Sequence, residues 1–113
     1  MIRSKLVALP IALLALAVFA VPAAAFKHHV TIKGSLGLYH FKPKTITITK
    51  GQSVHWSWSS DSEHNVTFTK LGGKHSKTAA SVSNFKVTFK KAGTFKYTCT
   101  VHGFAGKVVV QKP

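Results

Sequence analysis

Short runs in which apolar and polar residues alternate dominate this chain from Phe26 onward, for example over residues 45–49 and 85–89. Alternation with a period of two places one set of side chains on each face of a β-strand, and Gly, Pro and Ser residues separate the runs. We therefore expect an all-β protein. About seven strands with turn signals at this spacing predict a β-sandwich with Greek-key connections.

The same alternation predicts where the strands and loops lie. The connection through Gly34 and Gly37 and the polar residues 59–63 are expected to be loops. Residues 70–84 have no regular pattern and are expected to form a long surface loop with room for one helical turn. We find no internal repeat and no second domain. The expected strands cover residues 28–33, 45–49, 54–58, 65–69, 85–89, 94–99 and 106–111.

Residues 1–25 have the composition of a secretory signal peptide. Two basic residues precede an apolar run over residues 6–21, and three alanines before Phe26 form an A-x-A cleavage site. The alternative is an uncleaved membrane anchor, but the run is short for a span and Pro10 interrupts it. We expect cleavage, which leaves residues 26–113 as one domain that works in the periplasm or outside the cell.

The predicted mature domain is strongly basic. The formal charge of +14 for the whole chain includes Arg3 and Lys5, so the mature domain carries +12. It contains no Arg, the residue that supplies bidentate and stacking contacts to nucleic acids, and we expect no nucleic-acid partner. The lysines alternate with apolar residues, which is typical of solvated outer faces, although a dedicated binding patch is the alternative. In either case the field attracts acidic partners.

Cys99 is the only cysteine in the chain, so it cannot form an internal disulfide. It is an intermolecular link, a free thiol or a metal ligand. His102 follows three residues later, and His64 lies upstream at the head of an expected strand. Such residues are common in structural roles, and C-x-x-H alone is a weak signal. One thiolate with two imidazoles nevertheless matches a trigonal copper site, which normally has a weak axial Met, and the only Met here is Met1.

Together with the strand pattern, these residues resemble the cupredoxins, the small blue-copper proteins of the plastocyanin, amicyanin and pseudoazurin group. The resemblance implies a sandwich of eight strands or slightly fewer, in which His64, Cys99 and His102 bind copper at one end. It also implies that Asn65 hydrogen-bonds the loop after Cys99 and holds the two ligand segments together. The resemblance extends over nearly all of the mature chain and is carried by residues 41–43, 51–56, 64–66, 93–99, 102 and 106–110.

The axial position departs from the family pattern. In the shortest ligand loop of the family the axial Met would fall where Ala105 stands, and Ala105 has no donor atom. Three outcomes remain open. The copper is three-coordinate with the Glu63 carbonyl as a distant contact, or a water fills the position, or the domain has lost its copper role.

Cleavage before Phe26 would create a second candidate metal site. A free amine followed by Lys27 and His28 can bind Cu(II) or Ni(II) through the amine, two amides and the imidazole. The alternative is an ordinary exposed strand start.

The leading hypothesis is an exported electron-transfer protein that cycles Cu(II)/Cu(I) and passes electrons to a partner with an acidic surface. We see no general-base pair, no Ser/His/Asp set and no phosphate-binding glycine loop, so we do not expect an enzyme. We expect a monomer with no stable membrane insertion after cleavage. One alternative is a copper chaperone or scavenger without redox turnover, and a weaker one is a metal-free sandwich used for adhesion. Phe104 forms a dry contact patch beside His102 or merely caps the end of the fold.

Overall fold

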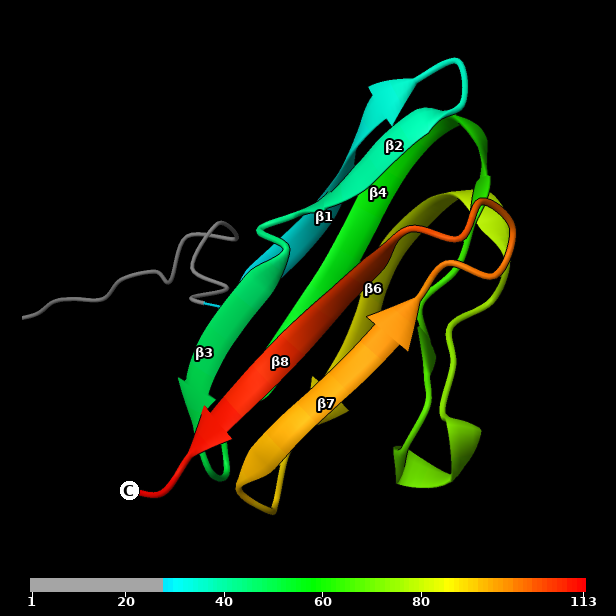
Figure 1. Ribbon diagram of the computed structural model, residues 1–113. Coiled ribbons are helices and arrows are strands. Elements are labelled where there is room, and N and C mark those ends of the chain that lie inside the picture. The colour runs from blue at the N-terminus through cyan, green and yellow to red at the C-terminus, as the bar shows by residue number, and fades with distance from the viewer. Residues whose placement is uncertain (1–27) are drawn as a thin grey trace, which may run out of the picture.

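The computed structural model describes residues 28–113, which form two four-stranded sheets packed face to face (Figure 1). The strand orders are β2-β1-β4-β6 and β3-β8-β7-β5. The prediction of an all-β sandwich of seven to eight strands is therefore confirmed. The elements are β1 His29–Ser35, β2 Leu38–Lys42, β3 Thr45–Thr49, β4 Ser53–His64, β5 Thr67–Phe68, the 3₁₀ turn η2 Leu71–Gly73, β6 Ala79–Thr88, β7 Gly93–Thr98 and β8 Ala105–Gln111.

Three segments that were expected to be loops contain strands. The chain turns back at Gly37, and β2 pairs with β1 as a hairpin in which Ser35 lies opposite Leu38. Strand β4 continues through residues 59–64, and the first half of β6 pairs with it across two register shifts. The side chains of these extensions are largely polar or exposed, so the alternation of apolar and polar residues that marks the other strands is missing.

The core forms where the strands alternate as predicted. Trp56 is fully buried, and its ring lies 5.4 Å from that of Tyr97 and 5.7 Å from that of Phe68, measured between centroids. Tyr97 and Cys99 are also fully buried. Aromatic rings therefore link the two sheets along the interior, and the buried sulfur of Cys99 lies at one end of this row.

Two chain segments meet at that end of the sandwich. Strand β4 ends at His64 in one sheet, while β7 ends immediately before Cys99 in the other. The loop from β7 to β8 closes this end (Figure 1). Within the described residues, no helix is long and apolar enough to cross a membrane. The predicted signal peptide lies outside the described residues.

Candidate metal centre

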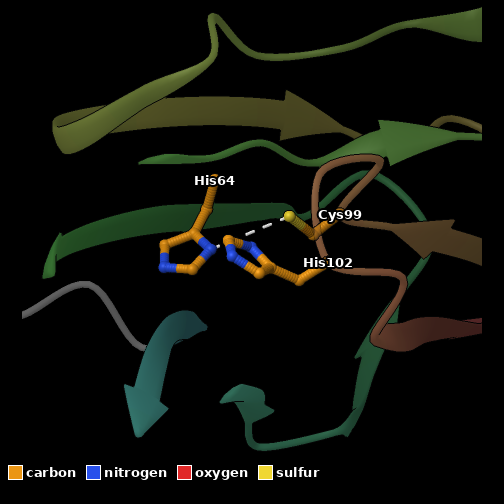
Figure 2. Close-up of side chains that lie close together, drawn as sticks. All are labelled: His64, Cys99 and His102. Carbon is orange, nitrogen blue, oxygen red and sulfur yellow. Dashed lines mark hydrogen bonds between the residues drawn. The ribbon is translucent and has the colours of Figure 1, made fainter. Parts of the chain in front are cut away.

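The structure brings together His64, Cys99 and His102, which we call the metal group. Their possible ligand atoms all lie within 4.8 Å of one another. The sulfur of Cys99 is 3.8 Å from Nδ1 of His64, and the two imidazole centroids are 4.9 Å apart. Figure 2 shows His64 approaching from one side and Cys99 and His102 from a single loop on the other. His64 and Cys99 are fully buried, whereas His102 is exposed.

A tight turn places Cys99 and His102 side by side. The backbone N–H of Gly103 donates to the carbonyl oxygen of Cys99 at 2.8 Å, and the N–H of Cys99 donates to the carbonyl oxygen of Phe104 at 2.9 Å. Gly103 has φ +82°, a conformation that glycine adopts without a steric penalty. Glycine at this position therefore lets the chain turn tightly between Cys99 and Phe104.

A hydrogen bond on the side away from Cys99 orients the ring of His64. Its Nε2 is hydrogen-bonded to the hydroxyl oxygen of Ser60 at 2.8 Å, which leaves Nδ1 directed at Cys99. Burial lowers the pKa of His64, the charge of His102 adds to this, and Asp61 partly opposes it. A neutral imidazole is the form that binds a metal ion, so this environment favours the ligating state.

His102 has fewer constraints than His64. Its Nε2 lies 3.3 Å from the hydroxyl oxygen of Ser62, and the residue is exposed. It is therefore the member of the metal group that an approaching molecule meets first.

Tyr39 contacts both histidines, and the sequence analysis did not single it out. Its ring centroid lies 4.5 Å from that of His64 and 4.7 Å from that of His102. Its hydroxyl donates to Asp61 at 2.8 Å, and Asp61 also accepts the backbone N–H of Leu36 at 3.1 Å. Both bonds lower the pKa of Asp61, and the bond from Tyr39 has the larger effect. The β1–β2 hairpin is thereby attached to the strand that carries His64.

Comparison with known proteins decides the family. Residues 6–110 match the family model described as a cupredoxin-like domain. The chain belongs to the cupredoxin family.

Individual relatives agree with this assignment. This chain is 30% identical over 112 residues to a plastocyanin from Synechococcus sp. strain JA-2-3B'a(2-13). The match covers 86% of this chain and 82% of the plastocyanin. The cupredoxin superposes on the amicyanin structure from Paracoccus versutus with a TM-score of 0.60 and 30% identity, over 80% of this chain and 85% of the other. A purple cupredoxin from Nitrosopumilus maritimus gives a TM-score of 0.63 at 23% identity, over 74% and 99% respectively, which supports the fold.

Asn65 joins the two ligand segments of this cupredoxin, as the resemblance implied. It is buried, and its side chain is hydrogen-bonded to both the hydroxyl and the backbone N–H of Thr100. Its amide also donates to the hydroxyl of Thr78 at 2.9 Å.

Ala105, which aligns with the axial Met of the family, lies on the outer face of its strand and not toward the metal group. Ala105 is exposed, shares the outward orientation of Lys107 in β8 and pairs with Thr98. Phe104 packs inward instead, with its ring centroid 5.5 Å from that of His64 and 4.6 Å from that of Phe41. The sequence analysis left two roles open for Phe104: a dry contact patch beside His102, or a cap over the end of the fold. Its packing against Phe41 and His64 favours the cap.

The residues present suit copper. One thiolate and two imidazoles are ligands that both oxidation states of copper accept, and a buried thiol next to a neutral imidazole provides two of them. The second candidate site at the N-terminus stays a prediction, since Phe26 and Lys27 lie outside the described residues. His28 is half-buried, and its Nε2 has no hydrogen-bond partner among the described residues.

Proposed function

We propose that this cupredoxin is a copper electron carrier that cycles Cu(II)/Cu(I), with His64, Cys99 and His102 as the copper ligands. Cupredoxins are copper-binding electron carriers rather than enzymes. The observation that carries the proposal is the close approach of the three ligand atoms, within 4.8 Å of one another, with His64 and Cys99 buried at one end of the sandwich.

The hydrogen bonds around the metal group support electron transfer over simple metal storage. Ser60 holds the far nitrogen of His64, and Asn65 ties the segment of His64 to that of Cys99. Ligands that are fixed by their surroundings keep one geometry in both oxidation states, so less rearrangement accompanies each electron. In this proposal the exposed imidazole of His102 is where the electron enters and leaves.

The axial position carries no protein sulfur in this proposal, because the only Met in the chain is Met1. A trigonal site without an axial donor should have a raised reduction potential, since the weak donor that favours Cu(II) is missing. A bound water would instead make the site more tetragonal.

We further propose that residues 1–25 are a signal peptide and that the domain works as a monomer in the periplasm or outside the cell. The composition of these residues supports export. The charge of +12 on residues 26–113 supports an acidic redox partner.

Copper handling is the second candidate function. The exposure of His102 favours it, because one ligand is open to an acceptor that would remove copper. Two rates separate the candidates: electron self-exchange in a Cu(I)/Cu(II) mixture, followed by NMR line broadening, and copper loss to a chelator. Fast self-exchange with slow copper loss is expected for a carrier. Slow self-exchange with rapid loss of copper would overturn the carrier proposal.

A further inference from the structure

A groove of about 340 Å³ lies on the outer face of the sheet that contains β3, β8 and β7. Its lining includes Lys44, Lys96, Lys107, Thr98 and Ala105, and we call it the lysine groove. Figure 1 shows these three strands side by side, with the loop of the metal group at one end of β7 and β8.

The strand register places two of the three lysines opposite each other, and the third precedes the adjoining strand. Lys96 on β7 lies directly opposite Lys107 on β8. Lys107 in turn lies opposite Thr45 on β3, and its backbone N–H donates to the carbonyl oxygen of Lys44 at 2.9 Å. All three lysines are exposed. Lys96 and Lys107 therefore project from neighbouring strands, and Lys44, immediately before β3, lines the same groove.

No acidic residue balances these lysines within their own sheet. The only acidic residues of the chain, Asp61 and Glu63, lie on β4 in the opposite sheet, and Asp61 already accepts bonds from Tyr39 and Leu36. Like charges directly opposite each other on adjacent strands destabilise a sheet. The repulsion between Lys96 and Lys107 therefore lowers the stability of the free protein. A partner that supplies carboxylates would offset this repulsion when it binds.

We propose that the lysine groove binds an acidic segment of a partner protein. The inference rests on the proposed function and assigns its acidic partner to a surface. Thr98 lines the groove and immediately precedes Cys99, so a bound segment lies beside the strand that leads into the metal group.

The lining favours a peptide over other anions. Tyr97, Ala105 and Gly106 contribute apolar lining between the lysines, and a lysine side chain itself combines an apolar stem with a terminal ammonium group. A chain that carries both carboxylates and small apolar side chains matches both features. Residues 26–113 contain no Arg to stack on bases, which disfavours nucleic acid.

The test uses a decapeptide of alternating Asp and Ala, titrated into the purified protein at low ionic strength and followed by amide NMR. One variant carries Lys44→Gln, Lys96→Gln and Lys107→Gln. Its matched control carries Lys33→Gln, Lys86→Gln and Lys90→Gln, which remove the same charge from exposed positions outside the groove. We expect the groove variant to bind about tenfold more weakly, with less than about a twofold change in the control.

Equal weakening in both variants would overturn the proposal, because net charge alone would then explain binding. So would a single-stranded oligonucleotide or inorganic phosphate that perturbs the same amides with higher affinity than the peptide. The Cu(II) spectrum of each variant keeps this result separate from the copper function. Peptide binding in a protein that shows no thiolate-to-copper band would leave the groove assignment intact and refute the carrier proposal alone.

Discussion

Asn65 and Thr100 are joined by two hydrogen bonds, one in each direction. The amide of Asn65 donates to the hydroxyl oxygen of Thr100 at 2.7 Å, and its carbonyl oxygen accepts the backbone N–H of Thr100 at 3.1 Å. Asn65 follows His64 and Thr100 follows Cys99, so this pair links the two segments that supply the metal group. Both bonds join protein groups only, so the fold itself helps to position the ligands.

Replacing Asn65 by Ala should destabilise the metal-free protein. The change removes the side-chain bonds to Thr100, Thr78 and Thr67 and leaves the backbone N–H of Thr100 without this partner. We expect the free energy of unfolding in guanidinium to fall by about 2–4 kcal/mol. Asn84→Ala is the control, because Asn84 is exposed and its side-chain oxygen is hydrogen-bonded to His55 Nδ1, 2.9 Å away, on the exposed side of the sheet. A similar loss in both variants would refute a special role for Asn65.

Replacing Ser60 by Ala should weaken copper binding while the fold remains. The variant removes the partner of His64 Nε2, so the ring is free to rotate away from Cys99. Loss of such a supporting group lowers metal affinity by about 10–100-fold, and competition with a chelator would measure it. Ser62→Ala, which removes only the 3.3 Å contact to exposed His102, should have a smaller effect. The reverse order would contradict our assignment of His64 as the rigid ligand.

The ionisation of Tyr97 should make the protein less stable at high pH. Burial raises the pKa of Tyr97 to about 12, and the Trp56 indole opposes this only partly. The unfolded chain loses this proton near pH 10, so the free energy of unfolding should fall as the pH rises from about 10 to 12. Urea unfolding of Tyr97→Phe over this range should show a shallower fall than wild type, because lysine titration is common to both. Identical slopes would show that Tyr97 ionises normally in the folded state.

Sequence reasoning recovered the parts of the molecule that have a clear hydrophobic alternation. The strands predicted over residues 54–58 and 94–99 contain Trp56, Tyr97 and Cys99, and all three are buried. It missed β2, in which Phe41 is the one fully buried residue among five, so the strand has no apolar alternation to detect. The position of Tyr39 beside His64 and His102 was missed for the same reason.

The axial position shows a second limit of the sequence pattern. Alignment with the shortest ligand loop of the family points to Ala105, whereas the structure turns Phe104 inward and leaves Ala105 on the outer face. Which of two adjacent residues faces the interior depends on how the turn after Cys99 closes. The hydrogen bond from Cys99 N–H to the Phe104 carbonyl sets that closure, and it is a tertiary feature without a local sequence signal.

The most direct test of copper binding by the metal group is the visible and EPR spectrum after addition of one equivalent of Cu(II), recorded beside Cys99→Ser. We predict an intense thiolate-to-copper absorption in wild type that is absent from the variant, with the balance of blue and yellow bands reporting trigonal or water-bound copper. A weak band of equal intensity in both proteins would place Cu(II) elsewhere, for example at the N-terminal histidines, and would contradict the assignment of His64, Cys99 and His102 as a redox copper site.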